Sequence, residues 1–207
     1  MDEEGLRPDL LDRALADRPS GSRVVYVTPT LQNPTTATVG AERRQRKVEV
    51  CAKHDALIIE DDVYGIFAPE HKPLASLAQD RVFHVSGLSK TLSPGLRVGI
   101  LAVPAWAARS AERQSQTSQT MVSPLSAHVM EIWLTDGTAE QVARSIRRES
   151  ARRSRLAQGI FSPTRSIAAA DGFHVWLPMP TAAAEEYVLR AAGEGIILMP
   201  ARAPLTD

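Results

Sequence analysis

The chain has 207 residues, of which 43% are hydrophobic and 23% are charged, a composition typical of a globular protein with one or two domains. Its 24 Lys and Arg residues balance 24 Asp and Glu residues, so no net field favours nucleic acid or a membrane surface. The single cysteine, Cys51, excludes an internal disulfide and a cysteine-rich zinc site. No run of about 18 apolar residues predicts a membrane span, and the acidic N-terminus lacks the apolar stretch of a signal peptide, so a cytoplasmic location is expected.

The first half of the chain alternates predicted strands with predicted helices. Apolar runs bounded by turn residues predict strands at residues 24–27, 56–59, 82–85 and 98–103. Helical patterns lie before and between them, at residues 9–16 and 40–54. The runs lack strict alternation of apolar and polar residues, which is typical of a parallel sheet covered on both faces. This order predicts an α/β fold with a mainly parallel sheet flanked by helices.

The second half of the chain is mainly helical in pattern. A polar stretch at residues 105–119 is expected to begin a long connecting helix. Pro124 favours the first turn of another helix, which Ser123 caps and which runs to about residue 134. After a turn, the remaining predicted elements are a helix at 138–158, a strand at 173–177, a helix at 182–192 and a strand at 196–199.

The segment SGLSKTLSPGLRVG, residues 86–99, follows the third predicted strand and contains one lysine, Lys90. A lysine at the end of a buried strand loses hydration, which favours its neutral amine, a nucleophile toward aldehydes. Arg97 offers a planar pair of donors suited to a phosphate. Together they indicate a lysine that binds a phosphorylated aldehyde, namely pyridoxal phosphate. Taken alone, Lys90 is better explained as a surface lysine in a loop, so the assignment depends on the flanking motifs.

Two upstream motifs strengthen this interpretation. The first is YVTPTLQNPTT at residues 26–36, and the second is LIIEDDVY at residues 57–64. In order and spacing, the three motifs resemble the pyridoxal-phosphate-dependent aminotransferases of fold type I (class I and II). The resemblance is closest to the aminotransferase-like domain of the MocR/GntR-type transcription regulators, and it extends over almost the whole chain.

The resemblance implies a role for each site residue. Lys90 would be the catalytic residue, which forms the Schiff base with the cofactor and transfers a proton during the reaction. Asp61 would pair with the pyridine nitrogen and keep it protonated. Tyr64 and Asn33 would contact the 3′-oxygen of the cofactor. Without the resemblance, Asn33-Pro34 reads as a turn.

Two carboxylates beside Asp61 are alternatives for its role. Glu60 and Asp62 are its direct neighbours in the sequence. Because side chains alternate along an extended strand, both should face away from Asp61. Carboxylates at strand ends are also often solvated or capping groups, so the sequence alone leaves these roles open.

The resemblance assigns the phosphate to Ser86, Ser89 and Arg97, with two departures from the family pattern. The family usually has Ser or Thr three residues before the lysine, where this chain has Gly87. It also usually has Gly after the Asn-Pro-Thr sequence, where this chain has Thr36. The first departure removes one phosphate hydroxyl, and the second changes a flexible position of the backbone.

The resemblance also implies that the chain covers part of the fold. Residues 1–104 would form part of the large cofactor-binding domain, and residues 105–207 the connecting helix with part of a small C-terminal domain. The segments that supply a phosphate-binding cup, a ring-stacking aromatic residue and a carboxylate-binding arginine have no counterpart here. We therefore expect residues 1–207 alone to bind pyridoxal phosphate weakly and to lack transaminase activity.

Three functions follow from the resemblance. The intact protein would transfer an amino group between an amino acid and a 2-oxo acid, as a homodimer. Alternatively, the domain is the ligand-sensing effector domain of a MocR-type transcription regulator, which would bind DNA through a winged-helix domain absent from this chain. The third interpretation is an inactive fragment.

Two further features favour structural roles. The five histidines have no metal-ligand spacing, so no metal site is predicted. The arginine-rich helix after Thr138 could form a nucleic-acid surface, but acidic neighbours such as Glu149 favour a solvated helix face.

Overall fold

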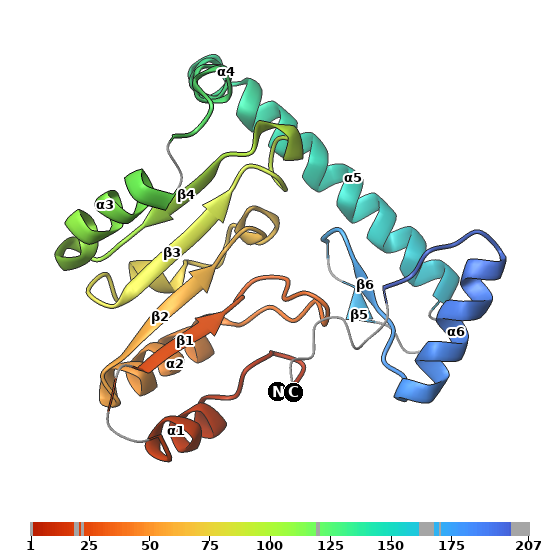
Figure 1. Ribbon diagram of the computed structural model, residues 1–207. Helices are drawn as coiled ribbons and strands as arrows, with labels where there is room; N and C mark the ends of the chain where they lie inside the picture. Colours follow the sequence, from red (N-terminus) through yellow and green to blue (C-terminus); the bar gives the residue numbers. More distant parts are fainter. Residues whose placement is uncertain are drawn as a thin grey trace.

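The computed structural model describes residues 2–18, 21, 23–118, 121–161, 168–169 and 171–199. A four-stranded sheet with its helices forms one part, and the long helix α5 connects it to a smaller part that contains β5, β6 and α6 (Figure 1). The elements of the first part are α1 (Pro8–Ala16), β1 (Arg23–Val27), α2 (Ala41–Lys53), β2 (Ala56–Asp61), β3 (Val82–Gly87), β4 (Gly99–Ala102) and α3 (Ala108–Ser118). Those that follow are α4 (Pro124–Thr135), α5 (Thr138–Phe161), β5 (Ala168–Ala169), β6 (Val175–Trp176) and α6 (Thr181–Gly193).

The main sheet has the strand order β1-β2-β3-β4. β1 pairs in parallel with β2, and β2 pairs in parallel with β3. β4 is antiparallel to β3 and pairs Gly87 with Gly99. The predicted α/β class with a mainly parallel sheet is therefore confirmed, and all four predicted strands of this sheet are present.

The core lies between the sheet and the helices α1 and α2. Burial alternates along β2, where Ala56, Ile58 and Glu60 are buried and the residues between them are partly exposed. Ala56 and Ile58 belong to one apolar cluster with Leu11 of α1 and Cys51 of α2. Full burial of a side chain such as Ile58 contributes about 2 kcal/mol, so this face supplies much of the stability of the sheet.

The opposite face of the sheet differs from the expectation of cover on both sides. Val24, Tyr26 and Leu101 lie on this face and are between 54% and 61% exposed within the described part of the chain. Apolar residues occupy both faces of these strands, so the sequence pattern does not alternate although the burial of the side chains does. The side chains of Val24 and Tyr26 lie on the less covered face, away from α2.

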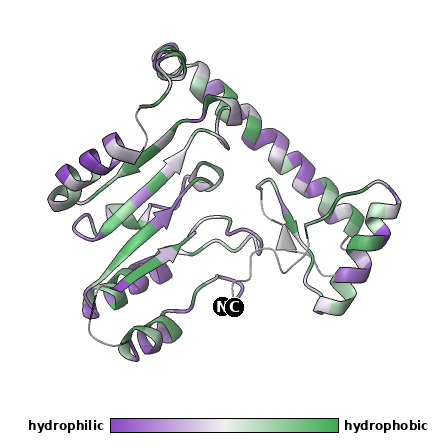
Figure 2. Ribbon diagram, viewed as in Figure 1, coloured by the Kyte–Doolittle hydropathy of each residue, from purple (hydrophilic) through white to green (hydrophobic). Residues whose placement is uncertain are grey.

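The first of two wrong predictions for the second half concerns the connecting helix. Residues 105–119 do not begin the connecting helix, because a 3₁₀ turn at Ala105–Ala107 leads into α3, which stays beside β4 (Figure 1). The connecting role belongs to α5, the 24-residue helix, much of which is hydrophilic (Figure 2). The helix at Pro124 is confirmed, with the Ser123 hydroxyl accepting from the Ser126 N–H.

The predicted strand at residues 196–199 is also wrong. The chain leaves α6 through Gly195, at φ 77°, and the Ile196 N–H donates to the Ala191 carbonyl at 2.8 Å, which closes the helix end. Ile197 is 95% exposed and pairs with no described strand. β6 pairs instead with β5, a segment that the sequence pattern did not single out. The domain boundary near residue 104 stays a prediction.

None of the described helices is long and apolar enough to cross a membrane.

Lys47 of α2 is a buried lysine, which is 3% exposed and faces the interior beside Val48. Burial, aided by the positive charges of Arg43 and Arg44, lowers the pKa of Lys47 to about 8.

We predict that Lys47→Met stabilises the protein at pH 7 by about 1–3 kcal/mol, because it removes a buried charge while keeping the side-chain length. The pKa of Lys47 is about 8 when folded and 10.5 when exposed, so the unfolded state binds more protons between these values. Wild-type stability should therefore rise from pH 8 to 10.5, and the advantage of the variant should shrink. Urea unfolding at several pH values measures this difference. The exposed Lys72→Met is the control, and equal behaviour of both variants would contradict the prediction.

Candidate functional site

The predicted site residues lie at one edge of the sheet. Asp61 is the last residue of β2, and Lys90 follows the end of β3 by three residues. Asn33 lies in the segment that follows β1. Because β1, β2 and β3 are parallel, these segments all leave the sheet at the carboxyl ends of its strands, where open α/β sheets bind ligands.

The amine of Lys90 lies beside two aromatic rings. Its Nζ lies 5.8 Å from the ring centre of Tyr64 and 6.0 Å from that of Phe173. Phe173 contacts Phe67 edge-to-face at 4.9 Å, and His174 lies 5.6 Å from Tyr64. The second half of the chain therefore contributes two rings to this site. Neither ring stands out in the sequence as a site residue, because both residues are simply the first two of the strand predicted at 173–177.

Asp61 is held by a tyrosine that the sequence analysis did not select. The Tyr26 hydroxyl donates to Asp61 Oδ2 at 2.6 Å, and the Val63 N–H donates to Oδ1 at 3.3 Å. Burial raises the pKa of Tyr26, and its hydrogen bond to the Asp61 carboxylate raises it further. Burial also raises the pKa of Tyr64, with a second contribution from the charge of Asp61. One carboxylate thus acts on both phenols.

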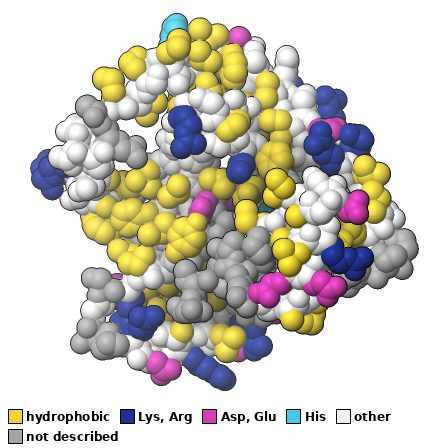
Figure 3. Space-filling model, turned by 45° about the vertical axis from the view of Figure 1, so that its right-hand side comes forward, with side chains coloured by type: hydrophobic (Ala, Val, Ile, Leu, Met, Phe, Trp, Pro, Cys, Tyr) yellow, Lys and Arg dark blue, Asp and Glu magenta, His cyan; other side chains and the backbone are white. Residues whose placement is uncertain are grey.

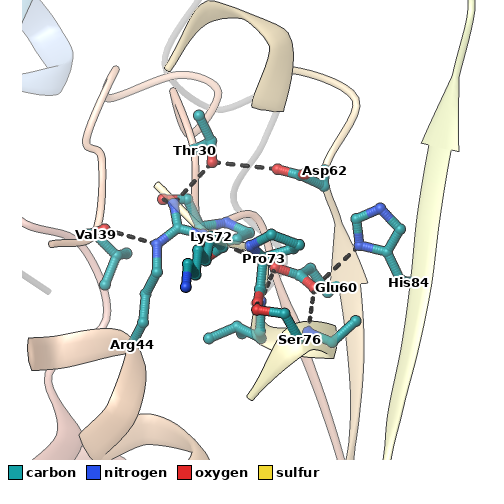
Figure 4. Close-up of polar contacts among 12 residues, drawn as sticks. Thr30, Val39, Arg44, Glu60, Asp62, Lys72, Pro73, Ser76 and His84 are labelled. Atoms are coloured by element: carbon teal, nitrogen blue, oxygen red, sulfur yellow. Dashed lines mark hydrogen bonds and ion pairs between the residues drawn. The ribbon is translucent and has the colours of Figure 1, made fainter. Parts of the chain in front are cut away.

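The two alternatives to Asp61 point elsewhere, as the strand alternation predicts (Figure 4). Glu60 is fully buried and accepts hydrogen bonds from the N–H groups of Leu74 and Ala75. Asp62 accepts from the Thr30 hydroxyl at 3.2 Å. Burial raises the pKa of Asp62, and the nearby charge of Glu60 acts in the same direction. The hydrogen bond from the Tyr26 hydroxyl therefore goes to Asp61 and not to Glu60 or Asp62.

The loop that carries Asn33 folds back on itself. The Gln32 N–H donates to the Ala37 carbonyl at 2.9 Å, and the Thr36 N–H donates to the Gln32 carbonyl at 2.7 Å. Asn33 is exposed at the tip and precedes Pro34 through a cis peptide bond. Thr36 has φ 64°, a left-handed conformation that is unfavourable for a β-branched residue. Thr36 stands where the family usually has glycine, and glycine would adopt this left-handed conformation without strain.

The three candidate phosphate ligands surround Lys90 in the sequence. Ser86 and Ser89 are partly buried, and Arg97 is exposed at φ 52°. The antiparallel β3–β4 ladder ends at Gly87 and Gly99, and the Leu88 N–H donates to the Val98 carbonyl at 3.1 Å, so the segments that carry Ser89 and Arg97 leave the sheet side by side. The turn between them is closed by the N–H groups of residues 91, 92 and 93, which all donate to the Leu88 carbonyl.

Neither a metal site nor a basic binding surface is supported in the described residues. No group of three His, Cys, Asp or Glu side chains there could hold a metal ion. On α5, Arg152 and Arg153 both pair with Glu149, and Arg144 pairs with Glu140. These pairs favour the solvated helix face that the sequence suggested.

The sequence profile of the family described as aminotransferase class I and II matches residues 2–206. The chain belongs to this aminotransferase family. It is similar in structure, over nearly its whole length, to the α-aminoadipate aminotransferase LysN of Thermus thermophilus, solved with N-(5′-phosphopyridoxyl)-L-leucine. The TM-score is 0.83 at 26% identity, over 96% of this chain and 54% of that one. The fold is thus that of the fold-type-I aminotransferases, represented in part.

Curated relatives of this aminotransferase-family chain include both enzymes and regulators. It is 26% identical to aromatic-amino-acid aminotransferase 1 of Thermococcus litoralis, over 98% of this chain and 52% of the relative. It is 29% identical to the uncharacterized HTH-type transcriptional regulator YdeF of Bacillus subtilis, over 75% of this chain and 34% of the relative. The chain therefore spans between about a third and a half of the length of these relatives.

The residues of this aminotransferase-family chain fit the cofactor that the family implies. A carboxylate, a lysine amine, an arginine and several hydroxyls converge at one sheet edge, the donor set that a phosphorylated pyridine aldehyde requires. The Thr91 hydroxyl, directly after Lys90, is buried and lacks a hydrogen-bond partner within the described ranges. A buried polar atom left unpaired in this way is consistent with a site that is completed by a bound group.

We predict that Asp61→Asn lowers the pKa values of Tyr26 and Tyr64, because it removes the negative charge that opposes ionisation of both phenols. The measurement is the tyrosinate absorbance during an alkaline titration, made in a Tyr187→Phe background so that only these two phenols contribute. Asp62→Asn is the matched control, since Asp62 contacts neither ring, and it should leave the titration unchanged. Coincident curves for Asp61→Asn and its parent would show that Asp61 is not charged beside the two tyrosines.

Proposed function

We propose that this chain provides the pyridoxal-phosphate site of a protein that transfers an amino group between an amino acid and a 2-oxo acid. The observation that carries the proposal is the convergence of Lys90, Asp61 and Tyr64 at the carboxyl edge of the parallel sheet, within a family of aminotransferases. The specific amino acid is left open by these residues.

Each side chain has a distinct task in this proposal. Bound pyridoxal phosphate supplies an aldehyde and an electron-accepting ring. Lys90 would bind the aldehyde carbon through its amine and would move a proton at the substrate α-carbon. Asp61 would keep the pyridine nitrogen protonated, and Tyr26 orients that carboxylate through its 2.6 Å hydrogen bond. Tyr64, whose ring centre lies 5.8 Å from the Lys90 amine, would donate to the 3′-oxygen of the ring.

The remaining residues orient the ring and hold the phosphate. Asn33 donates its side-chain amide to the 3′-oxygen, and its place at a loop tip leaves that amide available to a ligand. Arg97 binds the phosphate through paired charge-assisted hydrogen bonds, which Ser86 and Ser89 supplement. Because few phosphate donors are present, residues 1–207 alone should hold the cofactor weakly. A cytoplasmic homodimer is part of the proposal for the intact protein.

A second function is favoured by the relatives named as transcriptional regulators, which include YdeF and the vitamin B6 salvage pathway transcriptional repressor PtsJ of Salmonella typhimurium. In that case the same residues bind the cofactor and an amino acid, and the bound state controls DNA binding by a separate domain. Product formation separates the two functions. Given an amino acid and a second 2-oxo acid that accepts the amino group, an enzyme releases many equivalents of new 2-oxo acid per chain. A sensor changes the cofactor absorbance on adding the amino acid without sustained release of product.

We predict that Lys90 is the residue that pyridoxal phosphate modifies. The chain is incubated with a high concentration of the cofactor, reduced with borohydride and mapped by peptide mass spectrometry, a procedure that detects weak binding because reduction is irreversible. The modification should fall on Lys90 and be lost in Lys90→Ala. Lys53→Ala and Lys72→Ala are the controls and should keep it. Modification that persists in Lys90→Ala, at either of these lysines, would overturn the site assignment.

A further inference from the structure

Arg44 is a buried arginine that joins the loop carrying Asn33 to the rest of the fold (Figure 4). It lies on α2 and is 1% exposed. Its Nε donates to the Val39 carbonyl at 2.8 Å, and its Nη2 donates to the Pro29 carbonyl at 3.2 Å and to the Thr30 hydroxyl at 2.8 Å. Its Nη1 donates to the Lys72 carbonyl at 3.1 Å. One guanidinium therefore satisfies four acceptors.

Three of these acceptors, those of Pro29, Thr30 and Val39, lie at the two ends of one loop. We call residues 28–39 the Asn33 loop. Pro29 and Thr30 stand at its beginning, and Val39 stands at its end. The Val39 N–H donates to the Pro29 carbonyl at 2.9 Å and joins the two ends directly, and Arg44 reinforces this base by binding both carbonyls, while the internal bond from Thr36 to Gln32 shapes the tip. The position of Asn33 thus depends on a side chain that Asn33 does not touch.

The same guanidinium is linked to the strand that carries Asp61. Glu60 is 0% exposed, and its Oε1 lies 3.9 Å from Arg44 Nη1. Glu60 also accepts from the His84 ring, which raises the pKa of His84, and from the two N–H groups described above. On the other side of Asp61, Asp62 accepts from the Thr30 hydroxyl that Arg44 binds. Both sequence neighbours of Asp61 are therefore tied to Arg44.

We propose that Arg44 is a positioning residue of the cofactor site, which sets the place of the Asn33 loop relative to Asp61. The inference rests on the proposed function, because Asn33 and Asp61 act at opposite parts of one ring. Arginine is required since its planar fork reaches four acceptors in fixed directions, whereas lysine presents one compact charge. Arg44→Lys should keep the buried charge near Glu60 and lose the guanidinium bonds that reinforce the base of the loop, with the backbone bond from Val39 to Pro29 left as the direct link.

The first experiment measures the loop without any cofactor. Native-state hydrogen exchange is followed at the Gln32 and Thr36 amides, which are bonded inside the loop. In Arg44→Lys both should exchange at least about tenfold faster, since at least one charge-assisted bond at the base is lost. Amides of α1 should be unchanged. Arg46→Lys is the matched control, because Arg46 lies on the same helix with an exposed side chain.

The second experiment measures the site itself. Borohydride-trapped modification of Lys90 by pyridoxal phosphate should be about tenfold slower in Arg44→Lys, and the absorbance of the bound cofactor should change its dependence on pH. Thr30→Val, which removes the hydroxyl between Arg44 and Asp62, should shift the absorbance in the same direction. This second variant serves if Arg44→Lys fails to fold.

The outcomes are distinguishable. Absence of modification at Lys90 in the wild-type chain overturns the proposed function. Unchanged exchange at Gln32 and Thr36 in Arg44→Lys overturns the positioning role, whether or not Lys90 is modified. Faster exchange combined with unaltered modification rate and absorbance would also overturn it, since Arg44 would then stabilise the loop without affecting the site.

Discussion

The parallel pairing of β1, β2 and β3 is the constraint on which the rest of this structure depends. Strands that run in the same direction can be joined only if the chain crosses back over a face of the sheet. α2 makes this return between β1 and β2, and its apolar side packs on the strands that it connects. Segments distant in the sequence therefore leave the sheet at one edge, and their polar side chains meet there.

The two faces of β2 use their carboxylates differently. Glu60 points toward the helices, where donors from two backbone N–H groups and a histidine, together with the nearby guanidinium, allow a charge to exist without water. Asp61 points to the other face and has fewer donors, from Tyr26 and Val63. One step along the strand thus separates a structural carboxylate from one that remains available to a ligand.

Much of the first half could be predicted from the sequence, because its strands are apolar runs that end in polar residues. Asp61 and Lys90 were identifiable for this reason, and the motif spacing supported them. Arg44 was not, since the run AERRQRKVEVCAK contains several basic residues and only the fold determines which of them is buried. Phe173 was missed as a site residue because its place near Lys90 depends on how the second half returns to the sheet. The apolar residues at 196–199 resemble a strand, but a strand also requires a partner.

The contact between His174 and the Asn33 loop also has a consequence for the order of folding. His174 Nε2 lies 3.3 Å from the Gln32 carbonyl, although the two residues are separated by most of the chain. Contacts of such high sequence separation form slowly, because a long loop must close before they contribute any stability. During synthesis, the strands β1 to β3 and α2 emerge from the ribosome before Phe173 and His174 do. The amine of Lys90 therefore emerges with the Tyr64 ring already made, but well before the Phe173 ring that lies beside it in the folded chain.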